Sequence, residues 1–591
     1  MQPPSKFRVF ETLESRHVFA TFTVDSLFDS VDPNDGYFTL REAVQAANET
    51  REELHTITFM EGLTGSILLQ DERMRITSPV RILGPGVDKL TIDASSMDPT
   101  PGEFNSDGVH VFDFRMRYTS DTYEISDLTI TGSDGRYSAV SDIRGSQGLI
   151  RRVRFVKNGG ALGGANLRIE DSSFEFNVDG VGARNATILR SEFHNNWSSF
   201  RGGALGVRGA LEIRDSIFAD NWAGSDGGAI SMTADTDSDF ALIVNTTFSG
   251  NSTNDPTAGD VASGGAIVSR EYTSFRILNS TFSGNRINGT GTGGAIHFRG
   301  PATLEISNST IVDNAGNGIG GVEVESGSLL LRNSIVARNA GQDIRAATKA
   351  TYSLIGNSTG TGYVATNGQP DANGNQIGSS NQPLEPFLGV LRDNGGIVPT
   401  RLPRSISPAI NSGDPNFDDT TADGRFDQRG QPYRRVVGGR IDIGAVETTS
   451  FQDGDIDGNG VISVADIDRF CQAIRSNQVG DFDWNEDGFL DTADLREMTR
   501  RLGSTAGDAN LDYVFDSTDF ILVFQAAQYE DSLPLNSSWA TGDWNCDGEF
   551  NSADFIEAFQ SGSYQQQALP WQANRDIAAS LHFIHNGSKH R

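Results

Sequence analysis

Four acidic segments toward the C-terminal end of the chain share one spacing of oxygen-bearing residues. Each places carboxylates or amides at positions 1, 3, 5 and 12, with a backbone carbonyl available at position 7. Calcium takes about six to eight oxygen ligands, and alternate residues of a tight loop aim them at one point. The spacing therefore predicts four calcium-binding loops, called loops 1 to 4. Their ligands are Asp455, Asp457, Asn459, Val461 and Asp466; Asp483, Asn485, Asp487, Phe489 and Asp494; Asp508, Asn510, Asp512, Val514 and Asp519; and Asp543, Asn545, Asp547, Glu549 and Asp554.

A short amphipathic helix is predicted after each calcium loop. After loop 1, for example, the apolar residues Ile467, Phe470 and Ile474 recur at helical spacing. Position 8 is apolar in every loop, which predicts a short β contact between paired loops. Position 6 is glycine in three loops but Tyr513 in loop 3. A non-glycine residue at positive φ costs on the order of 1 kcal/mol. We therefore expect loop 3 to be the weakest calcium site.

The acidic loops resemble the bacterial dockerin module more closely than a calmodulin-type EF-hand. The resemblance rests on Asp at position 12 and on the lack of a clear helix before each loop. It implies two dockerin-like loop pairs, residues 451–503 and 504–562, whose fold depends on calcium. It also implies docking onto a cohesin-like protein or another cell-surface component.

The middle of the chain is a repeat of the form polar–Ser/Thr–x–Phe–x–x–Asn, and successive copies lie 19 to 34 residues apart. Alternating segments beside it predict strands, and Gly-Gly-Ala units between copies predict turns. Such a step is one coil of a solenoid, whereas leucine-rich and propeller repeats lack this spacing. We therefore predict an all-β right-handed parallel β-helix, with its apolar register residues stacked inside and the Asn residues in a second ladder. The register residues are Phe155, Phe174, Phe193, Phe218, Phe248, Phe282, Ile311 and Val336.

Both ends of the predicted β-helix, residues 21–450, resemble capping segments of bacterial surface β-helices of the pectin-lyase-like class. Residues 38–48 read FTLREAVQAAN and resemble the helical CSLREA segment that opens such proteins, with Phe38 in place of cysteine. Residues 441–447 read IDIGAVE and resemble the segment that closes them. The charged residues of the closing region, among them Asp427, Arg429 and Glu447, are expected to be structural.

Composition limits the classes of partner. The formal net charge of −31 disfavours nucleic acid, and residues 451–591 carry 24 acidic against 8 basic side chains. No apolar run is long enough for a transmembrane segment. Two cysteines, Cys471 and Cys546, permit at most one disulfide bond, and the sequence leaves their pairing open. Residues 1–20 are assigned to an export-related or disordered segment, and residues 563–591 to a C-terminal tail.

Candidate catalytic residues are few, and the sequence favours a binding protein over an enzyme. An insert contains Asp235, Asp237 and Asp239, and His297 and Arg299 follow a Gly-Gly-Ala turn. Neither group recurs at coil spacing with other acid–base residues. We therefore expect a secreted or cell-surface calcium-binding protein that acts in adhesion or polysaccharide binding. The alternative is a dockerin-bearing polysaccharide lyase or glycoside hydrolase acting on acidic polysaccharide.

Overall fold

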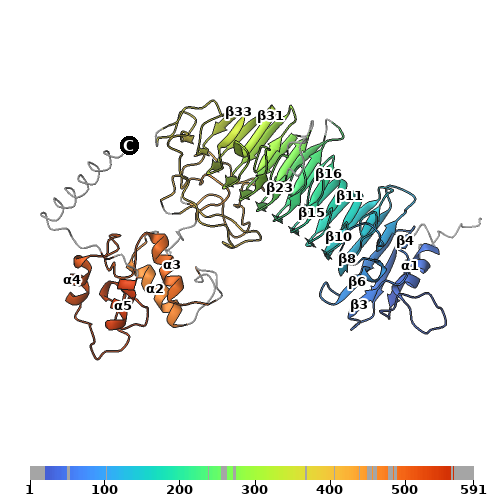
Figure 1. Cartoon of the computed structure of the whole chain (residues 1–591), viewed down its shortest axis with the longest axis horizontal. Coiled ribbons are helices and arrows are strands. Elements are labelled where there is room, and N and C mark those ends of the chain that lie inside the picture. Colours follow the sequence, from blue (N-terminus) through green and yellow to red (C-terminus); the bar gives the residue numbers. More distant parts are fainter. Residues whose placement is uncertain are drawn as a thin grey trace, which may run out of the picture. The chain divides into compact units, whose positions relative to one another are not determined.

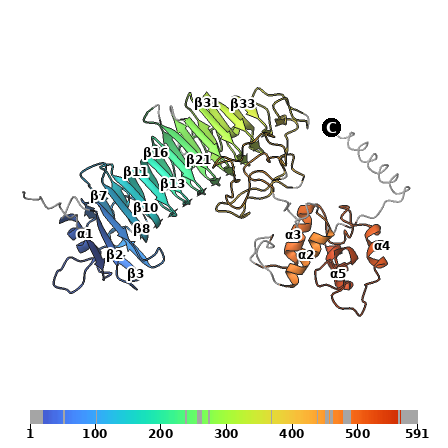
Figure 2. The ribbon, with the colours of Figure 1, turned by 180° about the vertical axis from the view of Figure 1, so that it is seen from behind.

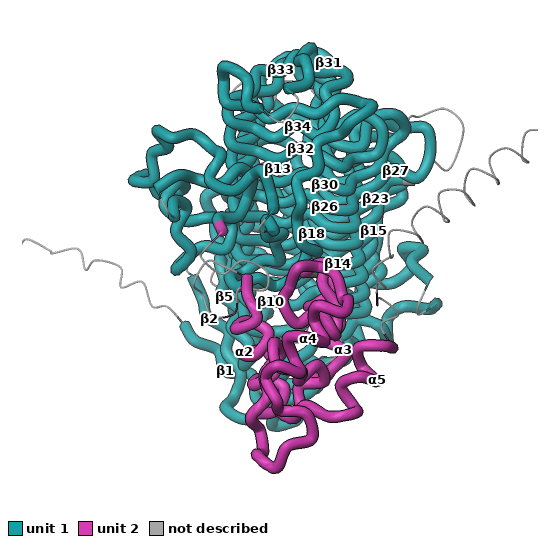
Figure 3. The backbone as a smooth tube through the Cα atoms, turned by 90° about the vertical axis from the view of Figure 1, so that its left-hand side faces the viewer, with its two compact units in different colours: residues 1–447 teal, residues 448–591 magenta. Residues whose placement is uncertain are grey.

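The computed structural model describes residues 20–49, 54–100, 103–236, 239–254, 262–270, 274–366, 369–404, 406–437, 439–448, 456, 462–476, 484, 489–560 and 564. The chain divides into two compact units, residues 1–447 and 448–591, which Figure 3 colours separately. Within the described residues, no helix has the length and apolar character needed to span a membrane.

The first unit is a parallel β-helix built from three ladders of strands (Figures 1 and 2). The first ladder contains β1 (Thr21–Val24), β2 (His55–Phe59), β5 (Val80–Leu83), β8 (Thr122–Thr131), β10 (Gln147–Val156), β11 (Leu162–Glu170), β13 (Val181–Leu189), β17 (Leu211–Arg214), β21 (Phe240–Val244), β25 (Ser274–Leu278), β29 (Thr303–Ser307), β31 (Ile319–Arg332) and β33 (Gln342–Thr351). The second contains β3 (Gly65–Leu68) and β6 (Leu90–Asp93), shares β8 and β10, and continues through β12 (Ser173–Glu175), β14 (Glu192–His194), β18 (Ile217–Ala219), β22 (Thr247–Ser249), β26 (Thr281–Ser283), β30 (Thr310–Val312), β32 (Ile335–Ala337), β34 (Leu354–Ile355) and β35 (Gln376–Ile377).

The third ladder contains β4 (Met74–Ile76), β7 (Phe112–Phe114) and β9 (Val140–Asp142), shares β11, β13, β31 and β33, and includes β16 (Leu205–Arg208), β20 (Ile230–Thr233), β24 (Ile267–Arg270) and β28 (Ile296–Phe298). A separate small sheet joins β15 (Trp197–Ser198), β19 (Trp222–Ala223), β23 (Ser252–Asn254) and β27 (Arg286–Asn288). The pairings within the ladders are parallel, which confirms the predicted parallel β-helix. Its right hand remains the expectation from the strong bias of parallel crossovers.

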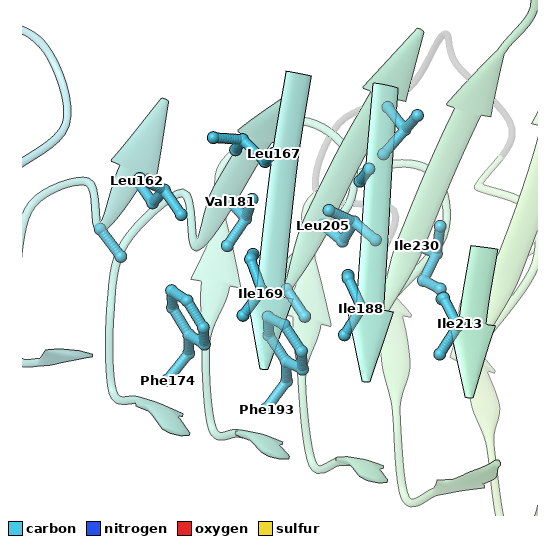
Figure 4. Close-up of a cluster of buried hydrophobic side chains, with 14 of the residues drawn as sticks. Leu162, Leu167, Ile169, Phe174, Val181, Ile188, Phe193, Leu205, Ile213 and Ile230 are labelled. Atoms are coloured by element: carbon cyan, nitrogen blue, oxygen red, sulfur yellow. The ribbon is translucent and has the colours of Figure 1, made fainter. Parts of the chain in front are cut away.

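The interior of the β-helix contains the predicted stack of phenylalanines. Phe155, Phe174, Phe193, Phe218, Phe248 and Phe282 are all fully buried. Their neighbouring ring centroids lie 4.5–5.0 Å apart, which is the spacing of successive strands. In Figure 4, Phe174 and Phe193 project from the second ladder toward aliphatic side chains of the other strands. The register predicted from the repeat is therefore correct.

Buried asparagines form a second internal ladder, as predicted. Each amide nitrogen donates to the side-chain oxygen of the next asparagine at 2.9–3.0 Å. The ladder ends at Asp343, whose Oδ1 accepts from Asn339 Nδ2 at 2.8 Å. The ladder satisfies backbone groups at a turn, because each amide also donates to a backbone carbonyl of an earlier coil. The members are Asn158, Asn177, Asn196, Asn221, Asn251, Asn285, Asn314 and Asn339.

Segments at both ends of the β-helix cover its apolar surfaces. The predicted N-terminal helix is α1 (Leu40–Glu49), which buries Leu40, Ala43, Val44 and Ala47 against the first coils. The closing segment differs from the expected end cap, because it lies along the side of the solenoid: Leu388, Ala409 and Ile443 pack on the outer face of the second ladder, and Gln428 reaches Thr247 and Thr281 on its middle coils. Here Asp427 and Arg429 form a buried ion pair at 2.7 Å. Their neighbours are backbone groups of the same closing segment, in keeping with a structural role.

In the part of the second unit that the structure describes there are four short α-helices, α2 (Val464–Arg475), α3 (Thr492–Leu502), α4 (Ser517–Gln525) and α5 (Ser552–Gln560). One hydrophobic cluster joins residues of both predicted loop pairs, from Ile467 to Ala558. Cys471 in α2 and Cys546 in loop 4 form a disulfide bond, which answers the question that the sequence left open. Arg496 of α3 also forms an ion pair with Glu557 of α5. The two halves are therefore joined by packing, covalent and ionic contacts.

Candidate functional site

Loop 4 brings three carboxylates together. One oxygen from each of Asp543, Asp547 and Asp554 lies within 4.8 Å of the other two. The loop is held by its own backbone, since Gly548 N donates to Asp543 Oδ2 at 3.0 Å and Trp544 N donates to Asp554 Oδ1 at 2.9 Å. Two unit charges at this separation repel by about 3–4 kcal/mol at an effective dielectric constant near 20. Protons or a bound cation would relieve this repulsion.

The position-1 ligand, Asp543, has a buried oxygen that no hydrogen bond satisfies. Asp543 Oδ2 accepts from Gly548 N and forms an ion pair with Arg475 at 3.0 Å, whereas Oδ1 has no hydrogen-bond partner. Burial, together with the nearby Asp554 and Asp547, raises the pKa of Asp543 to about 7. Burial also raises the pKa of Asp554 to about 6. An unsatisfied oxygen beside two further carboxylates fits the oxygen-only chemistry of calcium.

Loop 3 has the same ligand positions but a different internal arrangement. Asp508 Oδ1 accepts from Asp512 N at 3.1 Å, and Oδ2 accepts from Tyr513 N and Ser504 Oγ. Tyr513 has φ +73°, the left-handed conformation that favours glycine. Among the described residues, the carboxylates of loop 3 are not grouped as tightly as those of loop 4. The expectation that loop 3 is the weakest site therefore gains a geometric reason.

Loops 1 and 2 are described only in part. Asp466, Phe489 and Asp494 are described, and both aspartates are buried at the start of a helix. Trp484 N donates to Asp494 Oδ1 at 2.7 Å, which is the same position-2 to position-12 bond as in loop 4. The remaining predicted ligands lie outside the described residues: Asp455, Asp457, Asn459, Val461, Asp483, Asn485 and Asp487.

The predicted β contact between paired loops is wrong for loops 3 and 4. Phe550, at position 8 of loop 4, forms a parallel bridge with Tyr529 instead of with Phe515 of loop 3. Trp544, at position 2 of loop 4, contacts both position-8 rings, with centroids 5.8 Å from Phe515 and 6.0 Å from Phe550.

His297 and Arg299 lie in a larger polar cluster on the outer face of the third ladder. His297 is paired in register with Glu323 on β31, and Glu323 with Arg345 on β33. His297 Nε2 lies 2.9 Å from Glu325 Oε1, and Arg299 lies 3.7 Å from the same oxygen. Burial, reinforced by Arg299, Arg345 and Arg270, lowers the pKa of His297 to about 3. The imidazole is therefore neutral at physiological pH.

The acidic insert takes part in a different contact. Asp239 Oδ2 accepts from the backbone nitrogens of Asp235 and Thr236, so this carboxylate closes its own loop. Asp235 pairs with Arg184 at 3.0 Å. Asp237 lies outside the described residues. The structure therefore gives Asp235 and Asp239 local structural contacts.

A groove on the outer face of the third ladder is lined by arginines. Its volume is about 720 Å³, and Arg184, Arg201, Arg208 and Asp235 are among its lining residues. Arg201 forms an ion pair with Asp226, one coil along the ladder, at 3.3 Å. Arg184 and Arg201 are each paired with an aspartate, which partly neutralises their guanidinium groups, and Arg208 adds a further positive charge to the groove.

Sequence reasoning missed the residues that surround His297. Glu323, Glu325, Arg270 and Arg345 come from other coils, and only the strand register brings them to His297. The Gly-Gly-Ala units carried a usable signal, because aligning the four units places arginine at the same position in three of them, as Arg208, Arg270 and Arg299, with Thr233 in the fourth.

Comparison with known proteins shows only distant likenesses. No protein-family model and no curated protein matches the chain. Among solved structures, the pectate lyase Pel9A is 14% identical with a TM-score of 0.38, and the match covers 72% of this chain and 96% of that chain. YbhC of Escherichia coli is 13% identical with a TM-score of 0.20, covering 46% of this chain and 75% of that chain. At these scores the likenesses carry no argument, and the β-helix assignment rests on the strand pairings.

Proposed function

We propose that this chain is a secreted or cell-surface protein whose β-helix binds acidic polysaccharide and whose C-terminal unit binds calcium and docks onto a partner protein. The observation that carries the proposal is loop 4. There, three carboxylates converge and the buried Oδ1 of Asp543 has no hydrogen-bond partner. The other loops repeat the same ligand spacing in the sequence. The disulfide bond between Cys471 and Cys546 supports an oxidising compartment.

Calcium binding is tested by calorimetric titration of the full chain after chelation. The wild-type protein should bind calcium and gain thermal stability in its C-terminal unit, because the ion binds only the folded loops. Magnesium should substitute poorly, since it prefers a rigid octahedron and retains its waters. Asp543→Asn should remove one site. Asp531→Asn, a carboxylate in the same unit outside the loops, is the matched control and should bind as the wild type does. No heat of binding at millimolar calcium contradicts the proposal.

Polysaccharide binding is supported by the arginine-lined groove. Uronate carboxylates and sulfate groups pair with guanidinium groups in a bidentate manner. Affinity for polygalacturonate and for sulfated glycans, measured by affinity electrophoresis, should fall when Arg184 and Arg208 are both replaced by alanine. Arg276→Ala is the control, because this arginine is also exposed but lies on the first ladder. Equal retardation of the double variant and the control would place the glycan elsewhere.

Docking is supported by the apolar surface of the last two helices. Helix α4 contains five consecutive apolar residues, Phe520 to Phe524. Consecutive helical residues point in different directions, so they cannot all lie on one buried face. Ile521 and Phe524 of α4, and Ile556 and Phe559 of α5, are more than half exposed. Such a surface fits an apolar protein partner. A purified cohesin-type module should bind the calcium-loaded chain and should lose binding on Ile521→Asp; self-association of the chain would instead indicate a second copy as the partner.

The second candidate function is a polysaccharide lyase, favoured by the cluster around His297. Histidine and carboxylates are residue types that abstract and return protons, and a neighbouring guanidinium group stabilises negative charge that develops on the substrate. Incubation with polygalacturonate should then produce an unsaturated product that absorbs ultraviolet light, and Arg299→Ala should abolish this product. Binding without any product supports the first candidate.

A further inference from the structure

His297, Glu323 and Glu325 form a compact group on two neighbouring strands, β28 and β31. One ligand atom from each residue lies within 4.8 Å of the other two. All three occupy outward positions of the third ladder, because the alternate residues Ile296, Phe298, Val322 and Val324 belong to the interior. The group is separate from the calcium loops and contains a nitrogen ligand.

Two of the three side chains are buried although they point outward. The side chains of His297 and Glu323 are 2% and 0% exposed, under partly exposed neighbours such as Arg345 and Glu325. Buried polar atoms in proteins are almost always hydrogen-bonded. Here both ring nitrogens of His297 lack a hydrogen-bond partner, and so does Glu323 Oε2, whereas Glu323 Oε1 is in contact with the guanidinium group of Arg345.

The contact between His297 and Glu325 has the distance of a hydrogen bond but not the geometry of one. Nε2 of His297 lies 2.9 Å from Glu325 Oε1, yet Nε2 has no hydrogen bond. A metal ion placed between Nε2 and the carboxylate oxygens would give these buried polar atoms a partner. Two ligands of a tetrahedral zinc ion, each about 2.1 Å from the metal, lie about 3.4 Å apart. The observed spacing is thus within a small side-chain adjustment of a metal site.

Two arginines hold the carboxylates in place. Arg345 forms an ion pair with Glu323, and Arg299 approaches Glu325 Oε1 at 3.7 Å. A carboxylate has more lone pairs than one arginine uses, so ligand capacity remains. Outer partners of this kind fix the orientation of metal ligands. They also offset the negative charge that would attract calcium, and the imidazole favours a softer ion.

We propose that His297, Glu323 and Glu325 bind one divalent transition-metal ion of the zinc class, with Arg345 and Arg299 as orienting partners. The proposal is independent of the calcium loops and of glycan binding. One nitrogen and two carboxylate oxygens leave at least one coordination position for water or a ligand oxygen, which is the pattern of an open zinc site.

The test uses the full chain, stripped of metal and kept in excess calcium so that the acidic loops are filled. Cobalt, a spectroscopic substitute for zinc, is titrated while its visible absorption is recorded, and zinc binding is measured by calorimetry. The wild-type protein should bind one cobalt or zinc ion with a low-symmetry cobalt spectrum. His297→Gln and Glu323→Gln should each weaken zinc binding by more than about 100-fold, beyond the range for loss of an orienting partner.

His194→Gln is the matched control. His194 and Glu192 form an exposed pair at 3.0 Å on β14, and this contact is an ordinary hydrogen bond. This variant should bind zinc as the wild type does. Absence of calcium-resistant cobalt binding, or unchanged binding in His297→Gln, overturns the proposal. If the buried variants fail to fold, Glu325→Gln decides, because this side chain is partly exposed and its replacement leaves the packing intact.

Discussion

Replacing Asn221 by alanine should interrupt the internal asparagine ladder in the middle of the β-helix. Asn221 Nδ2 donates to Phe193 O at 2.8 Å and to Asn251 Oδ1 at 2.9 Å. Its Oδ1 accepts from the backbone nitrogen and the side-chain nitrogen of Asn196, both at 3.0 Å. The residue is fully buried, so water cannot readily replace these four bonds.

The expected cost follows from the groups that lose their partners. The substitution removes the acceptor of Asn196 N and the side-chain donor to Phe193 O, and it leaves Asn196 Nδ2 with one bond fewer. A buried polar group without a partner costs about 1–3 kcal/mol. Asn196 N and Phe193 O each lose a side-chain partner, and Asn196 Nδ2 loses one of its bonds. We therefore expect the free energy of unfolding to fall by roughly 3–5 kcal/mol. The neighbouring coils cannot rescue the site, because each coil contacts only the next one.

The assay is urea denaturation of the full chain in the presence of calcium, followed by the β-sheet circular dichroism signal. Asn185→Ala is the matched control, because Asn185 is only partly buried, donates to Asn166 Oδ1 at 2.9 Å and accepts from Ala210 N at 3.0 Å. Its replacement should cost about 1–2 kcal/mol. Equal costs for the two variants, or a cost below about 1 kcal/mol for Asn221→Ala, would refute the view that the ladder is a main source of stability.

The remaining predictions address the aromatic stack, pH dependence and the N-terminal cap. Phe218→Ala should cost roughly 3–5 kcal/mol in the same assay, since the flanking rings keep their positions and leave a cavity; a cost near that of a surface substitution would contradict the stacking. Burial raises the pKa of Asp343 to about 6, above the unfolded value near 3.9, so its contribution to stability is full below that value and is lost as pH rises through about 6. Asp343→Asn should flatten this part of the stability–pH profile, and an unchanged slope would exclude Asp343 as its source. Deletion of residues 1–50 removes β1 and α1 and exposes the edge of β2, so light scattering should detect aggregation; a monomeric folded product would show that the cap is dispensable.

The repeat allowed the interior of the β-helix to be predicted because its register residues keep one local pattern in every coil. In every repeat the apolar register residue and the asparagine are three positions apart, as Phe218 and Asn221 are, whatever the length of the loop between repeats. A stack of coils at constant spacing then places equivalent residues above one another. The serine of the same repeat was not interpreted, although Ser191 N donates to Ser216 Oγ at 3.1 Å and continues a further internal ladder.

The polar cluster on the third ladder could not be assembled in the same way. His297 and Glu323 are 26 residues apart in the sequence, and the register shifts by one residue between their Gly-Gly units. Loops of unequal length hide which positions of neighbouring coils are paired. In addition, packing in the interior does not restrict the residue type on the outer face, so no repeated pattern marks such a position. Internal positions follow from the repeat, whereas external sites require the strand pairings.

In the C-terminal unit, the contacts of loop 4 extend beyond the loop with which sequence order pairs it. The position-1 ligand of loop 4, Asp543, is paired with Arg475 of the helix that follows loop 1. The disulfide bond between Cys471 and Cys546 fixes that same helix to loop 4. Arg475 offsets one negative charge of a group with three carboxylates, and a calcium ion adds two further positive charges. We therefore expect calcium bound in loop 4 to stabilise α2 as well as α5. Occupancy of loop 4 and order around loop 1 should then change together.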